Sequence, residues 1–188
     1  PNGKQMLYLF HPLGKAVKVD KDGNPQPPVY RHVKEIYYRL DGEGYIDSEN
    51  THVWVANTRS GVSKQLVSGD YNDLHPCWSP DGKEIAFVSL RKADWRFRLE
   101  EHEIYRVSAN GGKVAAVTAP PGPKDAGMSY SPDGKFIAYI GHDQPYKGWG
   151  TVNSILNTVD INGKKHQKIG RNLARTSDLI TLGDVTPS

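Results

Sequence analysis

Serine, histidine and carboxylate side chains are the groups from which a hydrolase builds a nucleophilic site, and one serine stands in a suggestive context. Residues 61–65 read Gly-Val-Ser-Lys-Gln, which approaches the Gly-x-Ser-x-Gly elbow that exposes a catalytic serine between a strand and a helix. Gln65 occupies the place of the second glycine, and no helix is indicated after Ser63. We therefore interpret the segment as a hairpin turn and predict no catalytic residue in the 188 residues.

Residues that bind metals are present but poorly spaced. Asp20, Asp22 and Asn24 resemble the start of a calcium loop, but the glycine and the distal glutamate of such a loop are missing, so a plain turn is favoured. No two of the seven histidines have the spacing of zinc ligands; they are His11, His32, His52, His75, His102, His142 and His166. We predict neither a metal ion nor another cofactor.

The chain has a single cysteine. Cys77 precedes Trp78 in an apolar strand, where a small buried hydrophobic residue is favoured over a reactive thiol. One cysteine excludes an internal disulfide and fits a reducing compartment. We therefore expect a cytoplasmic protein.

Two loops carry residues that suit contacts with a substrate or with a neighbouring domain. In the first, Arg39, Asp41 and Glu43 would either pin the loop by ion pairs or present the arginine to a substrate carboxylate by bidentate contact. In the second, a histidine ends an apolar strand and aromatic residues follow, which would line a pocket, contact a partner domain or pack in a surface turn. The candidate contact residues are Arg39, Asp41, Tyr45, His142, Tyr146 and Trp149.

The charged residues do not indicate a nucleic-acid partner. The net charge of +3 comes from 24 basic and 21 acidic residues spread along the chain, whereas nucleic-acid-binding surfaces concentrate basic residues. Trp95–Glu101 alternates basic and apolar residues, which indicates either contact with an acidic partner or a charged hairpin loop; its two glutamates favour the loop. No stretch approaches the ~20 apolar residues of a membrane-spanning helix. We expect neither nucleic acid nor membrane as a partner.

The elements that position these loops are the strands of an internal repeat. Trp78–Val88 and Tyr130–Ile140 share a Ser-Pro-Asp-Gly-Lys turn followed by an apolar strand, and Pro1–Phe10 is a third copy without its start. Serine, proline, aspartate and glycine in this order favour a type I turn. In the strand that follows, apolar residues occupy both the odd and the even positions and so point to both faces. This strand must therefore be covered on both faces.

The repeat predicts an all-β fold, a partial β-propeller of four-stranded antiparallel blades, with about two complete blades and partial blades at both ends. A content of 19 glycines and 13 prolines is typical of many turns and few helices. All 188 residues would belong to one propeller domain: 1–51 a partial blade with an inserted loop, 52–102 and 103–153 blade-like repeats, and 154–188 a partial blade. We expect the insertions to lie between strands, where loops carry function.

Several segments resemble a known family. Asp70–Asp73, His75–Lys83, Tyr139–His142 and Arg39–Tyr45 resemble the WD40-like propeller of the prolyl oligopeptidase family of serine peptidases, in its acylaminoacyl peptidase branch. The turn itself is shared with other bacterial propellers, including that of TolB. In the peptidases, an α/β-hydrolase domain with a Ser, Asp, His triad follows the propeller, and we expect this domain to be absent from the present residues.

The resemblance implies a noncatalytic propeller segment of a serine peptidase. Its role would be to gate and size-select peptide substrates for the missing hydrolase domain, which would be its partner and, through it, so would peptides. The alternative is a TolB-like propeller that acts as a protein–protein binding module. Because an incomplete propeller exposes strand edges, we also expect self-association through blade edges.

Overall fold

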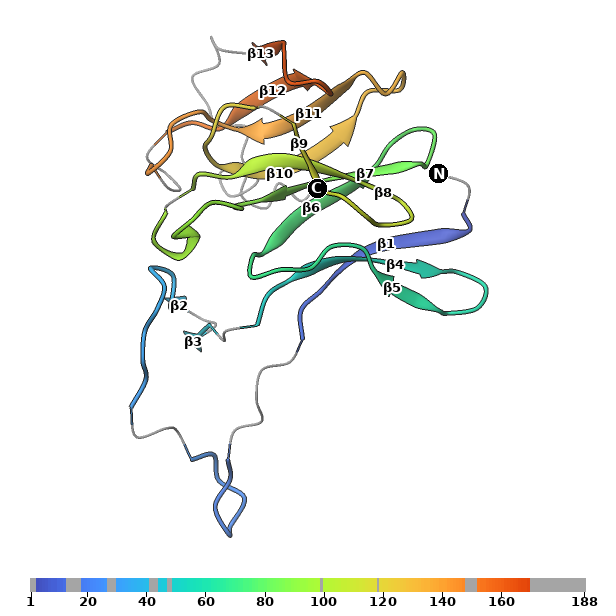
Figure 1. Cartoon of the computed structure of the whole chain (residues 1–188). Helices are drawn as coiled ribbons and strands as arrows, with labels where there is room; N and C mark the ends of the chain where they lie inside the picture. Colours follow the sequence, from blue (N-terminus) through green and yellow to red (C-terminus); the bar gives the residue numbers. More distant parts are fainter. Residues whose placement is uncertain are drawn as a thin grey trace, which may run out of the picture.

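Three antiparallel sheets are stacked one above the other, and a long segment extends from the lowest of them (Figure 1). The computed structural model describes residues 3–12, 18–26, 30–40, 44–46, 49–98, 100–117, 119–147 and 152–169. The predicted all-β, propeller-like fold class is confirmed.

Eleven strands form the three sheets. The first sheet has the order β1-β4-β5, with β1 (Gln5–Phe10), β4 (His52–Asn57) and β5 (Ser63–Gln65). The second has the order β6-β7-β8-β9, with β6 (Asp73–Trp78), β7 (Glu84–Ser89), β8 (Glu103–Ser108) and β9 (Ala115–Val117). The third has the order β10-β11-β12-β13, with β10 (Lys124–Tyr130), β11 (Phe136–Gly141), β12 (Ile155–Asp160) and β13 (His166–Ile169).

Two short elements lie outside these sheets. The strands β2 (Arg39–Leu40) and β3 (Gly44–Tyr45) pair with each other in the segment between β1 and β4. A 3-10 helix, η1 (Trp95–Phe97), lies in the loop between β7 and β8. Both elements belong to insertions between sheet strands, as the sequence predicts.

The repeated turn is closed by its own side chains. The amide of Gly82 donates to the Ser79 carbonyl at 2.9 Å, the closure expected of a type I turn. The Ser79 hydroxyl donates to Asp81 Oδ1 at 2.7 Å and accepts the amide of Glu84 at 2.9 Å. The second copy repeats this arrangement around Ser131, so the turn is specified locally in both sheets.

The core lies between the sheets, and β7 contributes to both of its layers. Ile85 and Phe87 are buried in the cluster shared with the first sheet, while Ala86 and Val88 are buried in the cluster shared with the third. Full burial of such a side chain stabilises the fold by about 1.5–3 kcal/mol. The cover on both faces that the sequence predicts is therefore provided by the neighbouring sheets.

The sheets are offset from the expected repeat units. Unit 52–102 begins at β4, the second strand of the first sheet, and unit 103–153 begins at β8, the third strand of the second sheet. Both units continue into the next sheet, because a sequence period does not reveal where within it a sheet starts. In the segment 154–188, predicted to be a partial blade, the structure places β12 and β13, which follow β11 in the third sheet; residues 170–188 lie outside the described part. The first sheet has three strands in the described residues.

The described residues include no helix that is long and apolar enough to span a membrane.

Gly134 provides a test of the turn. It has a φ of +70°, and an added Cβ would meet only the Pro80 ring of the neighbouring turn, at an ordinary 3.7 Å. Gly134→Ala therefore isolates the backbone strain, and we expect it to lower the free energy of unfolding by about 1 kcal/mol in urea titrations. Lys135→Ala, at the exposed adjacent position, should change stability by less than about 0.5 kcal/mol. Equal stability of Gly134→Ala and the parent protein would show that the turn is not strained.

Candidate functional site

The chain between β1 and β4, here called the inserted segment, is held against the second sheet by Arg96 of η1. Its Nε donates to Glu35 Oε1 at 3.1 Å, and its two terminal nitrogens donate to the Asp70 carboxylate at 2.6 and 2.5 Å. The backbone contributes as well, because the amide of Ile36 donates to the Arg96 carbonyl at 3.0 Å. One guanidinium thus joins three segments that are far apart in the sequence.

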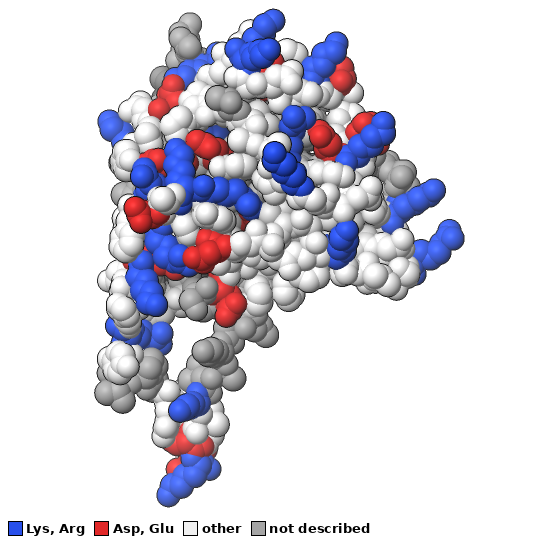
Figure 2. Space-filling model, in the orientation of Figure 1, with Lys and Arg blue, Asp and Glu red and all other residues white. Residues whose placement is uncertain are grey.

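The contact between Arg96 and Asp70 shifts the pKa of both residues. The hydrogen bonds from Arg96 lower the pKa of Asp70 from 3.8 to about 2, with a smaller contribution from Asn50. The same contacts raise the pKa of Arg96. Since the Asp70 side chain is 64% exposed, the pair adds little to global stability, and its effect is to orient the inserted segment. Basic and acidic side chains interleave along the left edge of the molecule, where this segment meets the loop after β7 (Figure 2).

A hollow of about 440 Å³ lies beneath the inserted segment. This volume is in the range of ligand pockets, about 300–1,000 Å³. Its apolar wall is formed by Tyr37, Ile46, Leu74, Leu90 and Trp95, and its polar rim includes His11, Glu35, Glu49, Arg96, Arg98, Glu100 and His102. The hollow reaches β6, which contacts β1, β4 and β10 and so lies where the three sheets meet.

A hydrogen bond between Tyr37 and Glu100 connects the inserted segment to the loop between β7 and β8, which also lines the hollow. The Tyr37 hydroxyl donates to Glu100 Oε1 at 2.9 Å, and burial beside this carboxylate raises the pKa of Tyr37 to about 12. Glu100 also faces His102, which lowers the pKa of Glu100 most strongly, and His142 contributes a weaker effect in the same direction.

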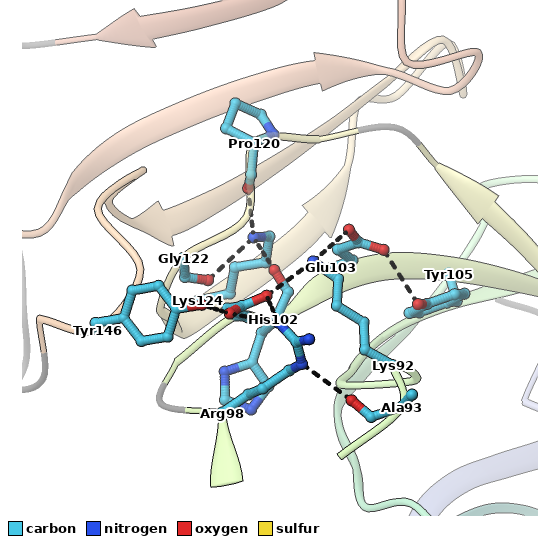
Figure 3. A network of polar contacts seen from close by, with 11 residues as sticks. Lys92, Ala93, Arg98, His102, Glu103, Tyr105, Pro120, Gly122, Lys124 and Tyr146 are labelled. Atoms are coloured by element: carbon cyan, nitrogen blue, oxygen red, sulfur yellow. Dashed lines mark hydrogen bonds and ion pairs between the residues drawn. The ribbon is translucent and has the colours of Figure 1, made fainter. Parts of the chain in front are cut away.

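Glu101 is the centre of a second polar cluster, and its partners Lys92, Arg98 and Tyr146 are labelled in Figure 3. The residue is 5% exposed, and its carboxylate accepts hydrogen bonds from Lys92 at 3.1 Å, from Arg98 at 3.0 Å and from the Tyr146 hydroxyl. The hydrogen bond from Tyr146 is the main reason why the pKa of Glu101 is lowered, and it raises the pKa of Tyr146 in turn. A buried carboxylate with two cations and a phenol is a fully satisfied structural anchor.

Lys124 joins the second and third sheets at the same end (Figure 3). Its buried ammonium donates to the carbonyls of His102, Pro120 and Gly122, at 2.7, 3.0 and 3.2 Å. An ammonium has three protons to donate, and here three carbonyls accept them. This lysine therefore stabilises the loop arrangement.

A buried ion cluster joins the first and second sheets. The Asp73 carboxylate is fully buried, with His52 Nδ1 at 3.0 Å and an Arg91 nitrogen at 2.8 Å. Ser89 lies opposite Asp73 in the strand register, but its hydroxyl donates to the Asn72 carbonyl at 2.8 Å. Serine, histidine and aspartate thus occur together here in a packing role, with the aspartate occupied by arginine.

The structure brings together two of the predicted contact residues, Arg39 and Tyr45. They are cross-strand partners in the β2–β3 hairpin, and the Arg39 guanidinium carbon lies 5.7 Å from the centre of the Tyr45 ring. Arg31 lies closer to the same ring, at 4.0 Å. Asp41, with Glu43, falls outside the described residues, so the predicted choice between an ion-pair network and a presented arginine stays open.

The other predicted contact residues belong to the turn after β11. His142 is buried, and its Nδ1 accepts the amide of Gln144 at 3.2 Å, so it caps the turn. Tyr146 has a φ of +67° and bonds to Glu101. Trp149 lies outside the described residues. Among the described residues, Glu100 links the two loops: Tyr37 donates to it, and His142 lies near enough to lower its pKa.

The residues that build the site were missed by sequence reasoning. Arg96 was assigned to a charged hairpin loop, and the structure does place it in a loop between blade strands. Its partners Glu35 and Asp70 are 61 and 26 residues away. No local pattern links charges over such separations, so the sequence offered no signal for this contact.

Several alternatives weighed from the sequence are resolved by the structure. Residues 61–65 belong to a hairpin, as predicted: Gly61, with a φ of +70°, lies in the turn after β4, and Ser63–Gln65 form β5. Asp20 accepts the amides of Asp22 and Asn24 at 2.9 Å each, so this carboxylate closes a plain turn. Burial raises the pKa of Cys77 to about 11, as suits a packed thiol. Among the described residues, no group of three or more histidine, cysteine or acidic side chains is arranged to hold a metal ion.

Stacked antiparallel sheets that share their apolar faces, with long loops at one end, define a segment of a β-propeller. A solved structure agrees: the putative TolB from Agrobacterium tumefaciens superposes with a TM-score of 0.51 at 23% identity, over 63% of this chain and 40% of that one. No protein-family model matches the sequence.

Curated relatives fall into two groups. The sequence is 28% identical over 136 residues to the uncharacterized peptidase YuxL of Bacillus subtilis, covering 69% of this chain. It is 26% identical over 157 residues to dipeptidyl-peptidase 5 of Porphyromonas gingivalis, covering 71%. It is 36% identical over 78 residues to the TolB homolog of Chlorobium chlorochromatii, covering 42%.

The matched part is 19%, 23% and 17% of these three relatives, so the chain spans about a fifth of their length. The chain is a β-propeller segment with homology both to peptidases and to TolB proteins.

Arg96→Lys tests whether the guanidinium holds the inserted segment. Lysine keeps the charge but loses the bidentate contact with Asp70, so we expect the amide of Ile36 to exchange its hydrogen about fivefold faster. Arg106→Lys is a matched control, because Arg106 pairs with Glu84 at 3.0 Å between β7 and β8. Hydrogen exchange is followed by mass spectrometry. Equal protection of the Ile36 amide in the two variants would contradict the role of Arg96 in holding the inserted segment.

Asp70 provides a pH test of the same contact. Because its folded pKa is lowered to about 2 from 3.8, its stabilising effect is complete above about pH 4 and is lost as the pH falls toward 2. In Arg96→Met, we expect the pKa of Asp70 to rise toward 3.8, as measured by carbon NMR of the carboxyl group. Asp133, whose pKa is lowered by Ser131 and Lys135 in a remote turn, should titrate identically in both proteins.

Proposed function

We propose that this chain is the noncatalytic propeller segment of a serine peptidase, of the acylaminoacyl peptidase or oligopeptidase type. Its role is to gate and size-select peptide substrates for a hydrolase domain. The observation that carries this proposal is the extent of the matches: two peptidases are matched over 69% and 71% of the chain, and the TolB homolog over 42%.

The position of the hollow supports a gating role. It lies where the three sheets meet, beneath an insertion that Arg96 and Tyr37 fasten to the second sheet. The ion pairs of Arg96 and the hydrogen bond from the Tyr37 hydroxyl both hold this segment in place, so the opening of the hollow stays narrow. Entry to this end of the stack is then governed by the inserted segment.

The mechanism is steric. Neighbouring chains in a sheet lie about 4.7–4.9 Å apart, so an extended peptide needs only a narrow passage. A folded domain of 100 residues has a radius of gyration of about 13 Å and does not enter such a passage. Selection by size therefore requires no chemical recognition of the substrate by the propeller.

The alternative function is a protein–protein binding module of the TolB type. The 36% identity to a TolB homolog and the TM-score of 0.51 to a TolB structure favour it. In that case the hollow beneath the inserted segment would receive a segment of a protein partner, and the full-length protein would contain no hydrolase domain.

The full-length protein distinguishes the two functions. We expect a Gly-x-Ser-x-Gly segment C-terminal to Ser188 and hydrolysis of acyl-peptide substrates that a serine-directed inhibitor abolishes, whereas residues 1–188 alone should be inactive. Absence of that segment, or of inhibitor-sensitive hydrolysis, would favour the binding module.

Gating itself is tested with peptides of increasing length. Replacing residues 13–46 of the full-length protein by a short Gly-Ser linker should raise kcat/KM for long, unstructured substrates relative to short ones. The same linker in place of the remote turn 58–62 is the control and should leave this ratio unchanged. An unchanged ratio in the first variant would exclude the inserted segment as the gate.

A further inference from the structure

Two arginines lie near the ring of Tyr45 in β3: Arg39 of β2 and Arg31 of the segment before β2. The Arg31 guanidinium carbon lies 4.0 Å from the centre of the Tyr45 ring, and that of Arg39 lies 5.7 Å from it. Tyr38 flanks the same ring, with the two ring centres 6.4 Å apart. An arginine over a tyrosine face is held by cation–π attraction, which restricts the long side chain without using its N–H groups.

Among the described residues, these arginines have no acidic partner. Within the residues that the structure describes, no ion pair involves Arg31, Arg39 or the nearby Lys34. The described carboxylates beside them, Glu35 and Asp70, are both bound by Arg96. Among the described residues, the acidic groups beside these arginines are thus occupied by Arg96, and Asp41 and Glu43 of the hairpin lie outside the described part.

A hollow adjoins two of these cations, Arg31 and Lys34. Its volume is about 400 Å³, and its lining includes Arg31, Lys34, Tyr38 and Tyr45. The side chains of Tyr38 and Tyr45 are 46% and 50% exposed, so a ligand would meet aromatic surface and cations together. It shares Glu35, Tyr37, Ile46 and Arg96 with the hollow beneath the insertion, whereas Arg31, Lys34, Tyr38 and Tyr45 line only this one of the two.

We propose that Arg31 and Arg39, aligned by Tyr45, bind a carboxylate of an extended polypeptide. A guanidinium presents a planar pair of donors that matches the two oxygens of a carboxylate. The exposed tyrosines would pack against the neighbouring part of the same peptide. The inference rests on the proposed function, because it takes the ligand to be a peptide. It adds that the gate first recognises acidic side chains or the C-terminal carboxylate of that peptide.

The test measures binding to the full-length protein, with any hydrolase serine blocked by a serine-directed inhibitor. The probes are four fluorescein-labelled, unstructured peptides of about 12 residues: with or without two aspartates, and with a free or an amidated C-terminus. We expect each carboxylate-bearing peptide to bind more tightly than the neutral amidated peptide, and increasing salt to weaken this binding. Tighter binding of only the aspartate peptides, or only the free C-termini, assigns the source of the carboxylate. Equal affinity for all four overturns the proposal.

Substitutions locate the site. Arg31→Gln and Arg39→Gln should each weaken binding of the acidic peptide by about 10-fold, as expected for loss of a charge-assisted hydrogen-bond pair. Arg59→Gln, in the exposed turn between β4 and β5 at the far side of the first sheet, is the matched control (Figure 1). Tyr45→Phe should bind like the parent because it keeps the ring, and Tyr45→Leu should weaken binding. Equal losses in Arg59→Gln and Arg31→Gln would show only diffuse charge attraction and overturn the site.

Failure of this site and failure of the proposed function are distinguishable. Hydrolysis of a neutral amidated peptide by the uninhibited full-length protein reports the peptidase and does not require the arginines. Binding of acidic peptides without any hydrolysis would keep the carboxylate site and remove the peptidase function. Hydrolysis without preference for a carboxylate would do the reverse.

Discussion

The structure depends on the need to cover both faces of strand β7. Ile85 and Phe87 point into the layer shared with the first sheet, and Ala86 and Val88 into the layer shared with the third. Each fully buried large side chain contributes about 1.5–3 kcal/mol, so an isolated sheet would leave one of these faces in water at a large cost. Stacking is therefore a condition for the second sheet to be stable. The repetition of the same turn and strand in the third sheet extends the stack.

Because the faces of the sheets are used for stacking, other roles fall to the loops at the strand ends. Here the loops are joined by polar contacts of long sequence separation. Arg96 links the inserted segment to the connector before β6, Glu101 gathers cations from its own loop and a tyrosine from the third sheet, and Lys124 binds carbonyls of two sheets. These contacts order one end of the stack and leave the hollows that make it a candidate site.

The same scaffold explains why the relatives fall into two groups. The turn and the two-faced strand satisfy only the demands of packing, so a peptidase propeller and a TolB propeller share them. Similarity in such elements shows the fold alone. The insertion between β1 and β4 and the loop after β7 lie outside these shared elements, and their contacts are made between segments rather than within a repeat.

The amino-acid sequence by itself determined the turn, the strands and the stacking. Ser-Pro-Asp-Gly closes through bonds between residues no more than five apart, and the apolar parities of β7 require two covering layers. Two things were decided only by the tertiary structure. One is where a sheet begins within the repeat: β12 and β13 complete the sheet that β10 and β11 begin. The other is the pairing of Arg96 with Glu35 and Asp70 and of Arg31 with Tyr45, because such contacts depend on where the loops lie once the sheets are stacked.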